Sequence, residues 1–278
     1  MFKTIINNGH YIFPENFSLD FPCQIDVCRF SDPIENHYRV LLLTTESSLS
    51  PNRVKAKDIL SHEHKYDLIL DHDVDVLSSC DNSLKFLYGS TWLNRGKINH
   101  PDSLGEYVDT EYGNEFSVSF LASWYPIDRP GYKLRQETYL RKNEITIPKV
   151  FYESVKSFNN PPNPLPNGEK ECLFNSMFHL CSENQSVENY FTEKIIDCFL
   201  TKTIPIYWGC PNIAEYFDSD GIIFIENVDD LINKVNNLTE DYYNERKDVI
   251  EKNKKIAITY ANLSERVRDV VSLHHATK

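Results

Sequence analysis

The chain has 278 residues, with 29 basic and 41 acidic side chains, so its formal net charge is −12. An acidic surface of this kind repels phosphate backbones and anionic lipids, which excludes a general nucleic-acid or membrane-surface binder. Hydrophobic residues make up 41% of the chain, enough for a large core. Length and composition therefore indicate an acidic globular protein with one large domain or two half-size domains.

The cysteines and the first residues of the chain indicate the cellular compartment. The chain has seven cysteines, no CxxC pair among them, and a polar start without a secretory signal. Thiols without a secretory route favour reduced, mostly buried cysteines, and no set of four zinc ligands is complete. We therefore expect a cytoplasmic protein with no membrane anchor and no structural metal.

Three buried strands are predicted in the first half of the chain. Short apolar runs between polar turns predict them at 39–45, 66–70 and 84–88. Residues 94–115 are polar and rich in Gly, Asp and Asn, which is typical of a loop or linker. We therefore expect two domains, at residues 1–110 and 111–278.

Strands and helices alternate in the second half. Hydrophobic patterning predicts strands at 116–124, 172–181, 204–209 and 221–225, and helices at 133–143, 192–202, 212–217, 228–238, 241–260 and 264–274. The proline-rich segment 159–168 interrupts them as an exposed loop. This alternation predicts an α/β fold with a parallel sheet that is covered on both faces.

The segment Thr192-Glu193-Lys194 is the first candidate site. Thr192 is a good helix N-cap, and the apolar residues after it recur at helical spacing. Glu193 and Lys194 then lie in the first turn, where free N–H groups favour an anion and the helix dipole opposes a lysine. This pattern predicts that Lys194 binds a phosphate and that Glu193 binds sugar or ribose hydroxyls. A capped helix with two solvated charges is the alternative.

Two more charged residues follow predicted strands. Arg135 lies in the helix after strand 116–124, at the carboxyl edge of the sheet, and its planar guanidinium suits a diphosphate. Glu46 follows strand 39–45, where a loop can present its carboxylate to a cleft. The alternatives are a basic surface helix and an ordinary loop residue.

A metal-dependent site is the main rival interpretation. The segment Asp71-His72-Asp73 follows a predicted strand, and such paired acids can hold Mn²⁺ or Mg²⁺ on a nucleotide diphosphate. Acidic triplets are common in an acidic chain, however, and Lys194 and Arg135 make a metal redundant. We therefore assign no metal site from the sequence.

Taken together, these segments resemble the alpha-1,3/1,4-fucosyltransferases, which form glycosyltransferase family ten. The matching blocks keep the family's order, and the C-terminal match covers roughly residues 116–230. The residues that carry the resemblance are Tyr190-Phe191-Thr192-Glu193-Lys194, Ser182-Glu183-Asn184, Arg135 with Tyr139, and Glu46 through Asn52.

The resemblance implies two Rossmann-like domains that face each other across a cleft (GT-B type). The N-terminal domain would be reduced, because only 45 residues precede Glu46. It also implies inverting, metal-independent transfer of fucose from GDP-fucose to an oligosaccharide or glycoprotein glycan, with no further cofactor. By this carry-over Glu46 is the general base, and the donor-binding residues are Arg135, Lys194, Glu193, Tyr190, Asn184 and Thr192.

Alternatives stay open at this stage. A compact enzyme without an anchor fits a bacterial or viral glycan pathway, and it could use another donor such as UDP-xylose. A non-catalytic saccharide-binding or scaffold protein is an alternative of another class. Retention of Glu46, Arg135, Glu193 and Lys194 argues against it. The oligomeric state is open.

Overall fold

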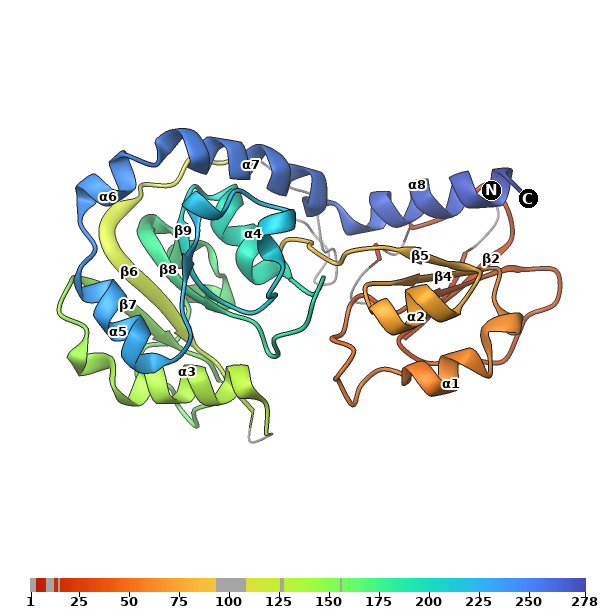
Figure 1. The fold of residues 1–278 in the computed structure, drawn as a ribbon, viewed down its shortest axis with the longest axis horizontal. Helices are drawn as coiled ribbons and strands as arrows, with labels where there is room; N and C mark the ends of the chain where they lie inside the picture. The colour runs from red at the N-terminus through yellow and green to blue at the C-terminus, as the bar shows by residue number, and fades with distance from the viewer. Residues whose placement is uncertain (1–3, 9–12, 15, 94–108, 126–127, 156) are drawn as a thin grey trace.

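The structure is a computed structural model that describes residues 4–8, 13–14, 16–93, 109–125, 128–155 and 157–278. Within these residues the chain forms two parallel β-sheets of five strands, each in its own lobe (Figure 1). None of the helices described is long and apolar enough to cross a membrane. The predicted α/β class with two domains is confirmed in outline, although most of the expected linker lies outside the described residues.

The first sheet contains strands from the first 85 residues in simple chain order. All neighbouring strands pair in parallel, so their carboxyl ends meet at one edge. The strands are β1 (Ile5–Asn7), β2 (Cys23–Val27), β3 (Tyr38–Leu42), β4 (Leu68–Asp71) and β5 (Ser83–Lys85). Two short helices, α1 (Ala56–Leu60) and α2 (Val74–Ser79), pack together beside this sheet (Figure 1).

The second sheet has the order β10-β9-β8-β6-β7, again with parallel pairing throughout. Its strands are β6 (Glu115–Ala122), β7 (Lys149–Glu153), β8 (Ser176–Ser182), β9 (Ile204–Trp208) and β10 (Ile223–Phe224). The central strand β8 is buried at every position. Its carboxyl end therefore opens at the middle of the sheet edge, where ligands bind in open α/β folds.

Helices cover both faces of the second sheet (Figure 1). On one face α3 (Pro130–Leu140) contacts α5 (Val228–Asn236), and on the other α4 (Glu193–Leu200) packs against α7 (Lys247–Ala261). The predicted helix 241–260 is two helices, because α6 (Glu240–Asn244) ends before α7 begins. The predicted strand 172–181 begins later than expected, because residues 171–175 form a 3-10 turn.

The last helix, α8 (Leu263–Ala276), returns to the first lobe (Figure 1). Its buried residues Leu263, Val267 and Val271 pack in the same core as β2 and β3. Chain order alone places this helix with residues 111–278, whereas its apolar face covers the first sheet. The chain thus passes between the lobes twice, and Arg266 in α8 donates to the carbonyls of Leu87 and Tyr88 beside the other passage.

Candidate functional site

Helix α4 begins as the sequence predicts, with Thr192 as its N-cap. The Thr192 hydroxyl oxygen accepts a hydrogen bond from the Lys194 backbone N–H at 3.4 Å, and Glu193 and Lys194 occupy the first turn. The stripe behind them, which includes Ile195 and Ile196, is fully buried against the second sheet. Local capping and tertiary packing therefore fix the same helix start.

Glu183 organises this helix start from the end of β8, and sequence reasoning gave it no role. Its fully buried carboxylate accepts from the Thr192 N–H at 2.8 Å and from the Lys194 ammonium at 3.2 Å. Two glycines leave room for it, because a Cβ at Gly209 would lie 2.6 Å from Glu183 Cγ and one at Gly131 would lie 1.8 Å from the Glu183 carbonyl oxygen. No local sequence signal marks Glu183, because its partners Thr192 and Lys194 lie nine and eleven residues further along the chain.

Glu193 lies between two ammonium groups. Its Oε1 is 3.6 Å from Lys194 Nζ and 3.5 Å from Lys170 Nζ, which in turn lies 4.3 Å from the centre of the Trp92 ring. Burial disfavours the Glu193 carboxylate, but Lys194, Lys170 and hydrogen bonds from Thr192 and the Glu193 backbone together outweigh it and lower the pKa of Glu193 to about 2. Glu193 is therefore a permanent acceptor, suited to bind hydroxyl groups.

Lys194 stays charged in the same cluster. Burial opposes the ammonium form, yet Glu183 and Glu193 more than compensate and raise the pKa of Lys194 above its usual range. Its side chain keeps 23% of its surface exposed, whereas the Glu183 side chain is fully buried. The lysine is thus the partner that can turn toward an incoming anion.

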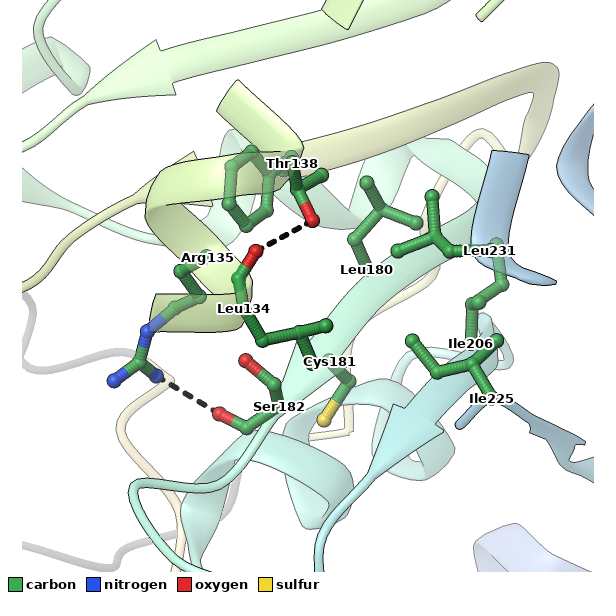
Figure 2. A pocket seen from close by; sticks show the side chains of 10 residues that line it. Leu134, Arg135, Thr138, Leu180, Cys181, Ser182, Ile206, Ile225 and Leu231 are labelled. Atoms are coloured by element: carbon green, nitrogen blue, oxygen red, sulfur yellow. Dashed lines mark hydrogen bonds between the residues drawn. The ribbon is translucent and has the colours of Figure 1, made fainter. Parts of the chain in front are cut away.

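Arg135 lies beside the same strand end, where its guanidinium is already engaged. It donates to the Ser182 carbonyl at 2.8 Å and to Asn184 Oδ1 at 2.7 Å. Figure 2 shows the guanidinium directed toward Ser182 and away from a small cavity lined by Ile206 and Leu231. That cavity measures about 10 Å³, barely the size of one water, so it is a packing gap in the core. Arg135 therefore holds Asn184 and the end of β8 in place, and its expected contact with a diphosphate stays a prediction.

Arg129 is a second arginine at this edge, and sequence reasoning missed it. It occupies the N-cap of α3, is 6% exposed, and its buried Nε has no hydrogen-bond partner among the described residues. Its guanidinium lies 5.6 Å from the centre of the Tyr132 ring, and that of Arg135 lies 4.8 Å from the same ring. Pro130 at the first helical position was the available signal, because proline marks helix starts.

The loop that carries Glu46 lies against the second lobe. The Ser47 hydroxyl donates to Gln185 Oε1 at 3.1 Å, which joins this loop to the residue after Asn184. Burial raises the pKa of the Tyr190 hydroxyl well above its usual range, and the charges of Glu183 and Glu46 raise it further. The Glu46 side chain is partly exposed. The fold therefore brings Glu46 and the Tyr190–Lys194 segment to one interface.

The acidic triplet Asp71-His72-Asp73, which begins at the last residue of β4, has a structural role in this arrangement. Arg53 forms a two-pronged pair with Asp71, with N–O distances of 2.8 and 2.7 Å, and both side chains are buried. Asp73 caps α2 by accepting from the Asp75 N–H. Among the described residues, no group of three His, Cys, Asp or Glu side chains is placed to hold a metal ion.

Two facing parallel α/β lobes with a candidate anion site between them define the GT-B glycosyltransferase fold. The chain superposes on a mutant of Staphylococcus aureus TarM in complex with fondaparinux, alpha-GlcNAc-glycerol and UDP, with a TM-score of 0.56 and 13% identity over 90% of this chain and 55% of that one. It also aligns with an alpha1,3-fucosyltransferase with GDP-fucose, with a TM-score of 0.49 and 21% identity over 84% of this chain and 69% of that one. No protein-family model matches the sequence.

The sequence is similar to the alpha-(1,3)-fucosyltransferase FucT of Helicobacter pylori. The two are 39% identical over 70 residues, which cover 24% of this chain and 15% of the relative's length. This match confirms the resemblance to the alpha-1,3-fucosyltransferase family.

Proposed function

We propose that the chain is an inverting, metal-independent glycosyltransferase that transfers fucose from GDP-fucose to a saccharide hydroxyl. The observation that carries the proposal is the charged cluster at the α4 N-terminus, which lies at the interface with the Glu46 loop. Similarity to a fucosyltransferase supports the donor sugar. The acceptor would be the glycan of an oligosaccharide or glycoprotein.

The charge balance of the cluster fits a nucleoside diphosphate. The cationic side chains are Lys170, Lys194, Arg129 and Arg135, and Glu183 and Glu193 are the acids that lie among them. Four cations against two carboxylates leave two positive charges in a protein whose net charge is −12. Those charges, with the free N–H groups of the first turn of α4, favour an anion at this place.

The chemistry follows from the two sides of the interface. Glu46, on the first lobe, would take the proton of the acceptor hydroxyl as its oxygen attacks the anomeric carbon of the donor. The bond from that carbon to the diphosphate breaks, and the diphosphate gains negative charge, which Lys194 and Arg129 would stabilise more strongly than in the ground state. Glu193 and Tyr190 would contact ribose or sugar hydroxyls. Thr192, Asn184 and Arg135 would hold these groups in place.

Binding of nucleotide sugars tests the donor directly. Thermal unfolding should be followed with GDP-fucose, GDP-mannose, UDP-glucose, UDP-galactose and UDP-xylose, each with and without EDTA. At 100 times its Kd, a ligand adds about 2.7 kcal/mol, which raises Tm by about 5 °C for a chain of this size. We expect this shift with GDP-fucose, unchanged by EDTA. A shift with UDP-sugars alone would reassign the donor, and no shift with any of them would favour a fold without turnover.

A further inference from the structure

Asn189 uses every polar atom of its side chain, and one of them crosses the interface between the lobes. Its backbone N–H donates to Asn212 Oδ1 at 2.8 Å, and its Oδ1 accepts from Asn212 Nδ2 at 2.9 Å and from the Tyr216 hydroxyl. Its Nδ2 donates to the carbonyl of His72 on the first lobe at 3.3 Å. Asn189 is 4% exposed and has a φ of 60°. The amide is thus held rigidly by the second lobe and reaches into the first.

From His72 a continuous series of contacts leads to the Glu46 loop. The His72 N–H donates to Asp71 Oδ1 at 2.7 Å, and the Arg53 guanidinium donates one hydrogen bond to each carboxylate oxygen of Asp71. The same guanidinium donates to the backbone carbonyls of Leu43 at 3.3 Å and Glu46 at 3.4 Å. A shift of His72 is therefore transmitted to the backbone that carries Glu46.

The other end of this series of contacts is the Tyr190–Lys194 segment, which we call the donor segment because it would bind the sugar donor. Asn189 directly precedes Tyr190, and the Tyr190 ring lies 5.2 Å from the His72 ring, centre to centre. The His72 ring is fully buried, and neither of its nitrogens has a hydrogen-bond partner among the described residues. The imidazole therefore serves as packing against Tyr190, and the His72 carbonyl is the group that receives the hydrogen bond from Asn189.

We propose that Asn189 and Arg53 are positioning residues that set the distance between the Glu46 carboxylate and the donor held by the second lobe. This inference rests on the proposed function, because it gives the series of contacts a catalytic purpose. It accounts for Asp71, the buried acid at the end of β4, whose two carboxylate oxygens are both paired with Arg53. It also accounts for an asparagine in left-handed backbone immediately before the donor segment.

The first variant is Asn189→Asp, which keeps the acceptor oxygen for Asn212 and Tyr216 and removes the donor to the His72 carbonyl. The second is Asn189→Gly, which tolerates the left-handed backbone and removes the whole amide. Asn160→Asp is the matched control, because Asn160 has a φ of 59° in an exposed loop. GDP is the binding probe, and GDP release from GDP-fucose in water is the rate.

We expect both Asn189 variants to bind GDP within twofold of the wild type. They should release GDP from GDP-fucose at least about tenfold more slowly, with KM little changed. A small misplacement of a reacting group lowers the rate by this factor. In a Glu46→Gln background, Asn189→Asp should slow the residual rate by less than twofold, because the effect acts through Glu46. A full additional loss in that background, or wild-type rates in both Asn189 variants, would overturn the inference.

Hydrogen exchange tests the same inference without turnover. Backbone amides of residues 43–53 should exchange faster in Asn189→Asp than in Asn160→Asp, because their anchor through Arg53 is loosened. Equal exchange would overturn the proposed coupling whatever the donor is. If instead the wild type neither binds GDP nor releases it while the exchange difference appears, the proposed function fails and the coupling between the lobes stands.

Discussion

The Lys194 ammonium lies 3.2 Å from the Glu183 carboxylate, which is fully buried at the carboxyl end of β8. Thr192 holds the same carboxylate through its N–H and its hydroxyl, so Glu183 is fixed and Lys194 is the movable partner. Without a donor, this pairing satisfies two charges that are costly to bury alone. A diphosphate at the first turn of α4 would draw the lysine toward it and leave Glu183 with its Thr192 bonds.

Lys194→Ala should weaken GDP binding about 10–100-fold, because a charge-assisted hydrogen bond contributes about 1.5–3 kcal/mol. It should also lower Tm, because Glu183 stays buried without its cation. Isothermal titration with GDP measures the first effect. Lys202→Ala is the control, since Lys202 pairs with Glu251 at the surface, where such pairs contribute little. Equal GDP affinity in the two variants would refute the phosphate role of Lys194.

Arg135 in α3 and Arg129 at its N-cap should separate the effects on stability from those on GDP binding. Arg135→Lys loses the fork to Ser182 and Asn184, so we expect Tm to fall by about 5–10 °C. Arg129→Lys should leave Tm within about 2 °C and weaken GDP binding several-fold. Thermal unfolding and titration of both variants check this pair. If Arg129→Lys lowered Tm and Arg135→Lys weakened GDP binding instead, the roles given to the two arginines would be wrong.

His72 should make the chain lose stability at acid pH. Burial lowers the pKa of His72 to about 3, so the unfolded chain binds a proton near pH 6.5 that the folded chain refuses. The contribution is complete above pH 6.5 and falls as the pH drops from 6.5 toward 3. His72→Phe keeps a ring against Tyr190 and should therefore lose less Tm than the wild type between pH 7 and 5. His64→Phe, at an exposed histidine, should lose as much Tm as the wild type over this pH range. An equal loss of Tm in the two variants would contradict the prediction.

Asp197 should act in the opposite direction. Burial raises the pKa of Asp197 to about 7, while its Oδ1 accepts from the Thr91 hydroxyl and the Trp92 N–H. The folded chain keeps a proton that the unfolded chain loses above pH 4, so this stability is present below pH 4 and is lost as the pH rises to 7. Asp197→Asn should thus raise Tm at pH 8 by about 2–4 °C relative to the wild type. Asp81→Asn, at an exposed acid, should show no such gain at pH 8. The same change in Tm in the two variants would contradict the role given to Asp197.

The sequence predicted those features that depend on neighbouring residues, such as the start of α4. The Thr192 cap and the apolar stripe after it specify α4, and they placed Glu193 and Lys194 correctly in its first turn. By contrast, β2 was missed, because Gln24 and Asp26 make it read as polar. Both are buried, and Asp26 pairs with Arg39 of β3 at 2.9 Å. That partner comes from the neighbouring strand, so the segment itself cannot show why it is buried.

The remaining gaps concern long-range placement. An amphipathic helix specifies that one face is buried and does not specify against which sheet, so the return of α8 to the first lobe could not be predicted. Glu183 became visible as the organiser of the site only when β8 and α4 were in place, since its partners lie nine and eleven residues further on. The helix that carries Arg135 starts at Pro130 and so places Arg129 at the sheet edge.

The rate of GDP release from GDP-fucose, measured in the wild type and in Glu46→Gln, tests whether the chain is a fucosyltransferase with Glu46 as its general base. We expect the wild type to release GDP and to transfer fucose to a saccharide acceptor in the presence of EDTA. We also expect Glu46→Gln to bind GDP normally and to turn over about 10²–10⁴-fold more slowly, since this is the usual contribution of a general base. Near-normal transfer by Glu46→Gln, or no GDP release by the wild type, would contradict this assignment.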